Sequence, residues 1–545
     1  MRSSMQDFPL SIGAILRFGE QTYGDSEVVT LGEGGARRRR SYAEVAARAA
    51  RLANGLRGLG IDGDQRVGTF MWNNAEHLEV YMAVPSMGAV LHTLNIRLFP
   101  EQIVYIANHA EDNVVVVDDS LIPILAKVLP QLTTVHTVLV NGGGDRSALE
   151  ESGKQILSYE DVLAASSVSF DWPQEIDERS AAAMCYTSGT TGNPKGVVYS
   201  HRSTWLHSMA VCTGNSNNLG ADDRVVPVVP MFHANAWGLP YAAFMSGADL
   251  VMPDRFLQAE PVINLIDAEQ ATVSAAVPTI WNDVLQFLRA NPREGSLSTL
   301  RAVLCGGSAV PRALIEAFDR EFGVTIFQGW GMTETSPLAA LSKPPAGVTG
   351  DVAWDYQAKA GRLQFGVEAR IVNDEGEVLQ NDGKEVGEIE LRGPWITASY
   401  YKDDDPAKFH DEWLRTGDVG AIDPLGYITI SDRSKDVIKS GGEWISSVEL
   451  EGEIMAHPSV LEAAVVGVPD DKWQERPLAC IVPRPGEAVD PASIRDFLVE
   501  RVVKWWLPER WAVIEAVPKT SVGKFDKKVL RKQYADGELE VTTLG

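Results

Sequence analysis

A stretch between residues 186 and 197, YTSGTTGNPKGV, combines residue types that could bind a polyphosphate. Glycine lets the backbone bend close to a ligand, while hydroxyl and backbone N–H groups can donate hydrogen bonds to an anion. It is not a Walker A loop, because Asn-Pro-Lys follows Gly192 where Lys-Ser/Thr would be needed. A Ser/Gly linker is the alternative, but the apolar run at 182–185 predicts a buried strand directly upstream and favours a binding loop. The residues expected to bind the anion are Thr187, Ser188, Gly189, Thr190, Thr191 and Lys195.

Two further glycine-containing turns follow predicted strands, at the position where parallel sheets bind their ligands. They are CGGSA at 305–309 and QGWGMTE at 328–334. In the second turn Trp330 can flank a base, and Glu334 together with Thr187 offers the oxygen ligands that Mg²⁺ prefers. Each stretch taken alone also fits an ordinary turn, so the interpretation depends on their order along the chain.

These stretches resemble the signature of the adenylate-forming acyl-CoA synthetase superfamily, and the later motifs follow in family order over nearly the whole chain. The resemblance implies an acid–thiol ligase that uses ATP, CoA and Mg²⁺ and passes through an acyl-AMP intermediate. The catalytic residues it implies are Lys524, Glu334 and Thr187, of which the last two would also hold the metal. The ATP- and AMP-binding residues it adds to the first stretch are Gly307, Ser308, Ala309, Gly329, Trp330, Gly331, Met332, Thr333, Asp418, Arg433 and Lys524.

The same resemblance assigns the thioester-forming step to residues near the C-terminus. It implies a hinge at Asp432, so that residues 1–431 form an ATP- and acyl-binding domain and residues 432–545 a mobile lid that carries the catalytic lysine. Some relatives, including luciferases, have a lysine where Gly441 stands, and this departure argues against luciferase-like chemistry. The CoA-binding residues it implies are Lys439, Gly441, Gly442, Glu443 and Trp444.

The acyl pocket is expected around MFHANAWG at 231–238, with His233, Trp237 and Gly306 as acyl-binding residues. Amino-acid-adenylating domains place an aspartate in this region to pair with the substrate ammonium, and none stands here. A buried ammonium without a partner is costly, so the expected substrate is a plain carboxylic acid. The bulk of Trp237 predicts acids of roughly three to eight carbons.

Within the superfamily the chain resembles medium-chain acyl-CoA ligases, and LSIGAILRFGE near the start and LFPEQIVYIANHAEDNVVVVDD are most similar to the 3-methylmercaptopropionate–CoA ligases. Two other functions stay open at this point. One is a fatty-acyl-AMP ligase that loads a carrier protein, and the other is a nucleotide-binding protein without catalysis. Assembly as a homodimer is also left open.

The amino-acid composition limits which partners the protein is expected to bind and in which compartment it is expected to work. Forty-nine basic and 74 acidic residues give a formal net charge of −25, which disfavours nucleic acid and anionic membrane as partners. No apolar run is long enough to span a membrane, and the N-terminus lacks a signal-peptide core. Four scattered cysteines show no metal-binding spacing, so the interpretation is a reduced cytoplasmic enzyme.

The elements that position these residues alternate between strand and helix, which predicts an α/β fold. After residue 361 the pattern changes to antiparallel strands, which predicts a small β-barrel-like region, and beyond residue 432 a small α+β unit follows. Ser41 with Glu44 predicts a capping box, and a helix is expected at 494–503. The run Arg37–Arg40 is interpreted as a solvated edge rather than an anion-binding patch.

Overall fold

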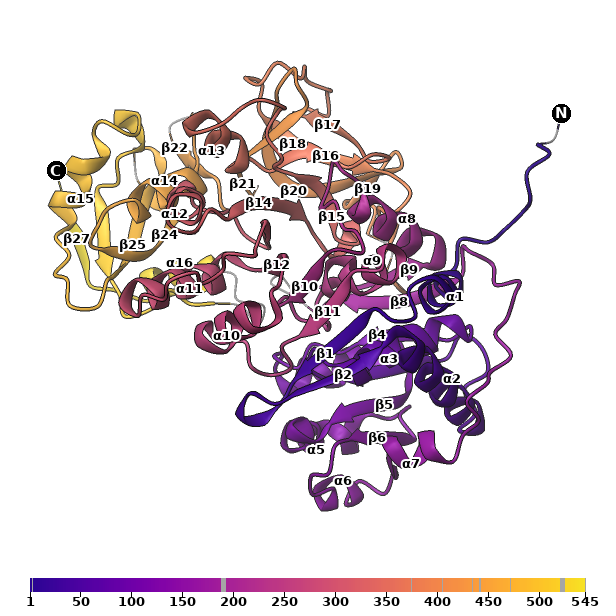
Figure 1. Cartoon of the computed structure of the whole chain (residues 1–545). Coiled ribbons are helices and arrows are strands. Elements are labelled where there is room, and N and C mark those ends of the chain that lie inside the picture. Colours follow the sequence, from indigo (N-terminus) through magenta and orange to yellow (C-terminus); the bar gives the residue numbers. More distant parts are fainter. Residues whose placement is uncertain are drawn as a thin grey trace.

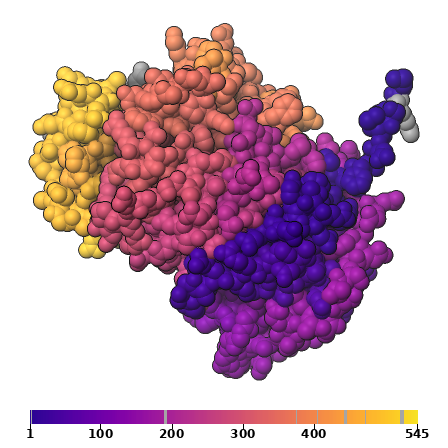
Figure 2. All heavy atoms as spheres, viewed as in Figure 1, coloured from indigo at the N-terminus to yellow at the C-terminus, as the bar shows by residue number. Residues whose placement is uncertain are grey.

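Three β-sheets with helices packed against them form the molecule (Figure 1). The C-terminal residues lie together at one end, and the first residues extend away from the body (Figure 2). The computed structural model describes residues 1, 3–187, 193–373, 375–403, 405–433, 435–440, 443–470, 472–519 and 525–544, without the side chains of 443 and 444.

The N-terminal sheet has seven strands, and every neighbouring pair is parallel except the last. Its inner strand β5 carries an uninterrupted run of four valines that are fully buried, as expected where helices cover both faces of a parallel sheet. In spatial order the strands are β7 (Gln155–Ser158), β6 (Thr137–Asn141), β5 (Asp112–Asp118), β3 (Arg66–Phe70), β4 (Val90–Thr93), β8 (Ala181–Tyr186) and β9 (Gly196–Ser200).

The largest sheet has fourteen strands and joins a half that is parallel apart from its edge strand β2 to an antiparallel half at β14 and β15. The β-barrel-like region expected after residue 361 is therefore continuous with the second parallel sheet. The short strand β19 (Phe409–His410) pairs with β20 off the main path. The path runs through β17 (Glu368–Val372), β18 (Gly387–Arg392), β20 (Trp413–Ile422), β21 (Tyr427–Arg433), β16 (Gly361–Leu363), β15 (Leu338–Leu341), β14 (Thr325–Gly331), β13 (Ala302–Gly306), β12 (Val273–Ala276), β10 (Arg224–Pro227), β11 (Asp249–Met252), β1 (Glu27–Leu31) and β2 (Arg37–Ser41).

The C-terminal sheet has six strands of its own, and hydrophobic cores lie on both of its faces. Strand β24 (Val460–Asp470) pairs with β25 along most of its length. The other strands, in spatial order, are β23 (Glu443–Ile445), β22 (Ile438–Ser440), β25 (Gln474–Pro483), β26 (Arg510–Val513) and β27 (Val541–Thr543).

Sixteen α-helices occur in the described part of the chain, and none of these is long and apolar enough to cross a membrane. They are α1 (Ile12–Thr22), α2 (Tyr42–Gly58), α3 (Ala75–Ser86), α4 (Pro100–Ala110), α5 (Ile122–Val128), α6 (Ser147–Glu150), α7 (Tyr159–Ala164), α8 (His201–Cys212), α9 (Leu239–Ser246), α10 (Ala259–Glu269), α11 (Pro278–Ala290), α12 (Arg312–Phe322), α13 (Asp351–Gln357), α14 (Ser447–Met455), α15 (Pro491–Leu498) and α16 (Lys527–Ala535).

The alternating pattern of the sequence is confirmed, including the capping box of Ser41 and Glu44 at the start of α2. The helix expected at 494–503 was placed too late in the chain, because α15 begins at Pro491 and ends at Leu498. Beyond it the N–H groups of Val499 and Arg501 bond the carbonyls three residues back, those of Asp496 and Leu498, so the chain continues as a tight turn.

The interpretation of Arg37–Arg40 as a solvated edge was incomplete. The run forms edge strand β2, but its arginines bond carboxylates of the same chain, among them Glu269, Glu76 and Glu79, which are all buried. Burial alone would raise the pKa of Glu76, but the bond from Arg38 and the charges of Arg38 and Arg40 lower that pKa to about 2. The run therefore neutralises buried acids of helices α3 and α10.

Candidate active site

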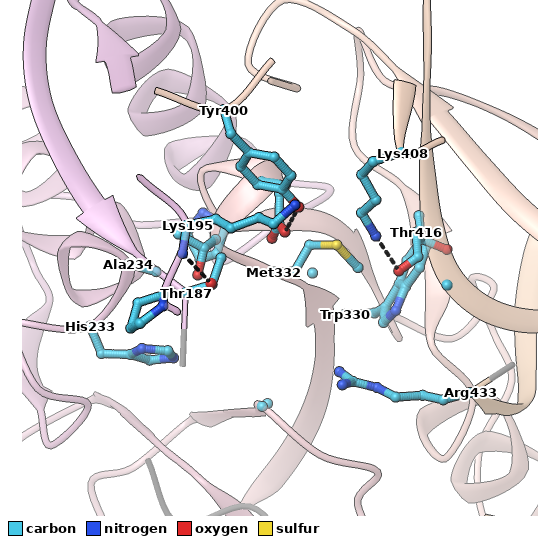
Figure 3. A pocket seen from close by; sticks show the side chains of 18 of the residues that line it. Thr187, Lys195, His233, Ala234, Trp330, Met332, Tyr400, Lys408, Thr416 and Arg433 are labelled. Carbon is cyan, nitrogen blue, oxygen red and sulfur yellow. Dashed lines mark hydrogen bonds between the residues drawn. The ribbon is translucent and has the colours of Figure 1, made fainter. Parts of the chain in front are cut away.

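A cavity of about 870 Å³ lies between the carboxyl ends of strands in the large sheet, the 187–195 loop and the start of α16 (Figure 3). This is the position expected for a ligand of an α/β sheet. Predicted site residues that line it are Thr187, Lys195, His233, Trp237, Gly306, Gly307, Gly329, Trp330, Gly331, Met332, Thr333, Glu334 and Arg433.

The ends of the 187–195 loop are held together by two hydrogen bonds. The backbone N–H of Thr187 donates to the carbonyl of Lys195 at 2.9 Å, and the N–H of Lys195 donates to Oγ1 of Thr187 at 3.0 Å. The loop joins antiparallel strands β8 and β9, unlike a Walker A loop, which joins a strand to a helix. The expected anion-binding residues Ser188, Gly189, Thr190 and Thr191 lie outside the described residues.

Lys195 ends among acidic and aromatic side chains. Its Nζ lies 2.7 Å from Oδ2 of Asp405 and 3.2 Å from Oδ2 of Asp403, and 4.7 Å from the ring centre of Tyr400. The hydrogen bond to Asp405 is the main reason why the pKa of Lys195 is raised. The lysine side chain is 36% exposed, so the pair is worth at most about 1 kcal/mol and a phosphate could replace the carboxylates.

Glu334 is fixed at the exit of β14. Its Oε1 accepts a hydrogen bond from the hydroxyl of Tyr400 at 2.6 Å, and its carbonyl accepts one from Thr397 at 2.8 Å. The neighbouring carbonyl of Thr333 accepts the hydroxyl of Tyr199 at 2.7 Å. The described residues contain no cluster of three His, Cys, Asp or Glu side chains that could hold a metal alone. One carboxylate and one hydroxyl fit Mg²⁺ that is held largely by substrate phosphates and water.

Three residues expected at the nucleoside come together beside β20 and β21. Asp418 and Arg433 are paired across these strands, and Oδ1 of Asp418 lies 3.4 Å from Nε of Arg433. The indole N–H of Trp330 donates to Oδ2 of Asp418 at 2.8 Å. Arg433 and Trp330 line the cavity, whereas Asp418 lies directly behind them.

The part of the cavity expected to hold the acyl group is built by a short left-handed segment between β10 and α9. Ala234, Asn235, Ala236 and Trp237 have φ values of 41°, 50°, 49° and 57°, which are sparsely populated for residues with a side chain. A Cβ at Gly306 would lie 2.8 Å from the carbonyl oxygen of Gly329 and 3.5 Å from the indole of Trp237, so only glycine fits there. Aliphatic side chains complete this end of the cavity, namely Leu304, Leu338 and Leu341.

Several predicted residues do not reach the cavity. Ser308 and Ala309 lie beyond the turn at Gly307, and Lys439 stands on β22, where its backbone N–H donates to Oε2 of Glu475 at 2.9 Å. Glu443 begins β23, and its side chain and that of Trp444 are not described. Gly441, Gly442 and Lys524 lie outside the described residues.

The hinge candidate Asp432 is buried on β21, at 1% exposure. Its Oδ2 accepts the backbone N–H of Ser447 at 2.7 Å and the hydroxyl of the same residue at 2.5 Å. Lys527 at the start of α16 reaches that hydroxyl and lies 2.7 Å from Oε1 of Glu451. Phe525 and Lys527, which follow the expected catalytic lysine, both line the cavity.

Sequence analysis missed the residues contributed by the segment 400–408. Tyr400, Asp403, Asp405 and Lys408 all line the cavity. This segment has neither a glycine-rich turn nor a predicted strand exit, and its charged residues are typical of a solvated loop. No signal in the sequence distinguished these residues from those of an ordinary surface loop.

Comparison with known families decides the wider relationship. A model described as AMP-binding enzyme matches residues 17–401, and a model of the AMP-binding enzyme C-terminal domain matches residues 449–524. The chain belongs to this family. The order of the two matched segments agrees with the order of the motifs along the sequence.

Similar proteins support the family over almost the full length. A 3-methylmercaptopropionyl-CoA ligase of Ruegeria pomeroyi is 43% identical over 98% of this chain and 99% of its own. A long-chain-fatty-acid–CoA ligase of Thermus thermophilus is 44% identical over 98% and 97%. The crystal structure of the anthranilate CoA ligase AuaEII in complex with anthranoyl-AMP superimposes with a TM-score of 0.86 at 26% identity, over 99% of this chain and 100% of that one.

Proposed function

We propose that this AMP-binding enzyme is an ATP-dependent acyl-CoA ligase. In the first step the carboxylate of the acid attacks the α-phosphorus of ATP, which forms acyl-AMP and releases pyrophosphate. In the second step the CoA thiolate attacks the acyl carbon and AMP leaves. The observation that carries this proposal is one cavity whose lining combines cationic and polar residues with Trp237 and three leucines of one hydrophobic cluster.

Neither step requires a nucleophile from the protein, so catalysis rests on orientation and on charge stabilisation. We assign Lys195 and the 188–191 residues to the β- and γ-phosphates, and Lys524 to the carboxylate and α-phosphate. Thr187 and Glu334 would hold Mg²⁺, which when bound supplies positive charge to the phosphate oxygens. Trp330, Asp418 and Arg433 would hold the nucleoside.

For the second step we propose that residues 432–545 move as a lid relative to residues 1–431. One support is that the C-terminal residues form a separate sheet. The other is Asp432, which lies on β21, the last strand of the large sheet along the chain, while its side chain accepts a hydrogen bond from the first turn of α14. The rotation would withdraw Lys524 and bring in the CoA-binding residues Lys439 and 441–444.

We propose a short- to medium-chain acid as the substrate, with 3-methylmercaptopropionate as the leading candidate. The Ruegeria relative named for that acid supports this choice, and the thioether sulfur is apolar and polarizable enough for a leucine-lined pocket. The four free cysteines suit a reducing compartment such as the cytoplasm. A homodimer is a further proposal, which analytical ultracentrifugation would test.

The proposal is tested by incubating the protein with ATP, Mg²⁺, CoA and a panel of acids, and by measuring AMP, pyrophosphate and CoA thioester. Equal amounts of the three products, each dependent on the acid, are expected. The proposal would be contradicted if the amount of AMP and pyrophosphate were the same with and without CoA, or if ADP and phosphate were released instead.

A further inference from the structure

Lys408 presents its amine to the same cavity from a segment that no motif marks. Its backbone is held on both sides, because its N–H donates to the carbonyl of Asp405 at 3.0 Å and its carbonyl accepts the N–H of Arg415 at 2.9 Å. The side chain extends to the carbonyl of Thr416, which its Nζ contacts at 3.3 Å. Figure 3 shows it on the opposite side of the view from Lys195.

The carboxylates whose charges act on Lys408, namely Glu334, Asp418 and Glu388, are already bonded to other residues. Glu388 accepts Arg415 and the backbone N–H of Gly417, Glu334 accepts Tyr400, and Asp418 accepts Trp330. Among the described residues Lys408 belongs to none of the ion pairs, in contrast to Lys195.

An ammonium has three N–H donors, and the described residues supply Lys408 with one acceptor, the Thr416 carbonyl. Burial lowers the pKa of this lysine, and the negative charges of Glu334 and Asp418 oppose that effect. A half-buried cation that faces a cavity and has no carboxylate partner among the described residues is expected to bind an anionic ligand.

We infer that Lys408 binds the α-phosphate of the nucleotide, an inference that rests on the proposed ATP site. The charge of Lys408 is influenced both by Glu334, at the expected metal end, and by Asp418, at the expected ribose end. The phosphate that joins the ribose to the metal-bound phosphates is the α-phosphate. Lys408 therefore contacts a group that ATP and AMP share, whereas Lys195 contacts phosphates that only ATP has.

The test compares the affinities of the full-length protein for ATP, AMP and adenosine by isothermal titration calorimetry. Lys408→Met removes the charge and keeps the length of the side chain. Loss of a charge-assisted hydrogen bond should weaken ATP and AMP alike, by about 10- to 100-fold, and leave adenosine unchanged. Lys408→Arg should stay close to the wild type, since it retains the charge.

Lys154→Met is the matched control. Lys154 is also partly buried and donates to two backbone carbonyls, those of Leu132 and Val135, each at 2.7 Å, and it lies outside the cavity. This variant should bind all three ligands like the wild type.

Unchanged AMP affinity in a folded Lys408→Met protein would overturn the inference, as would an equal loss of affinity for adenosine. If the wild type itself binds no ATP, the proposed nucleotide site fails as a whole, and the inference fails with it.

Discussion

Replacing Trp237 by alanine should change which acids the enzyme prefers. The indole lies against Gly306, and a leucine-lined space adjoins it. For short acids, losing this contact should lower kcat/KM by about 10- to 200-fold, which corresponds to roughly 1–3 kcal/mol. Each methylene that a longer acid places in the vacated space is worth up to about 0.8 kcal/mol, or roughly fourfold.

The assay measures kcat/KM for straight-chain acids of increasing length, with Trp172→Ala as a control. Trp172 is a partly buried tryptophan that packs against Phe170 and lies outside the cavity. The optimum should move to longer acids in Trp237→Ala and stay in place in the control. An unchanged optimum in a well-folded Trp237→Ala protein would refute the assignment of this residue to the acyl pocket.

The backbone at Trp237 gives a second, independent readout. Its φ of 57° costs roughly 1–2 kcal/mol for any residue with a Cβ, and glycine avoids that cost. The melting temperature of Trp237→Gly should therefore be at least as high as that of Trp237→Ala. In the middle of a helix or strand, by contrast, glycine lowers stability by about 0.5–1 kcal/mol relative to alanine. A clearly less stable glycine variant would contradict the left-handed conformation of this segment.

Three further predictions follow from the site and the core. Lys524→Ala should abolish acyl-AMP formation but leave conversion of supplied acyl-AMP to thioester largely intact; equal loss of both steps, measured separately, would reject its assignment. Glu334→Gln should lower the adenylation rate and weaken its dependence on Mg²⁺ while the melting temperature falls little, and a normal magnesium titration would show that another group holds the metal. Burial lowers the pKa of His77 to about 4 and that of His207 to about 3, from 6.5, so the unfolded chain takes up these protons first as the pH falls. Between pH 7 and 5 each histidine should therefore remove roughly 2 kcal/mol of stability. Burial raises the pKa of Asp118 to about 7 and that of Asp254 to about 6, so these carboxyl groups act in the opposite direction over the same range. The measurement is therefore a comparison of two proteins: acidification from pH 7 to 5 should destabilise His207→Gln less than the wild type, and an equal change in melting temperature would contradict the buried neutral state of His207.

Sequence patterns predicted the elements best where the local signal and tertiary packing agree. The four valines of β5 are an example, because a short apolar run of β-branched residues favours a strand that is covered on both faces. The capping box at Ser41 is another, since its two partners lie within one turn of each other.

Contacts between distant segments could not be read from the sequence. The arginines of β2 bond glutamates 12 to 232 positions away, so their local run indicated only exposed charge. Likewise, the partners of Lys195 at Asp403 and Asp405 lie more than 200 residues along the chain. Lys408 could be recognised as a site residue only from the structure, where its side chain lies beside Thr416 and lines the cavity.

The central claim is that the acid is activated by adenylation in this cavity before CoA is involved. Exchange of labelled pyrophosphate into ATP, measured without CoA, tests it most directly because exchange requires a reversible acyl-AMP step. The account predicts exchange that depends on a suitable acid and on Mg²⁺, and that is lost in Lys524→Ala. No exchange with an acid that the enzyme converts to its CoA thioester would contradict the account.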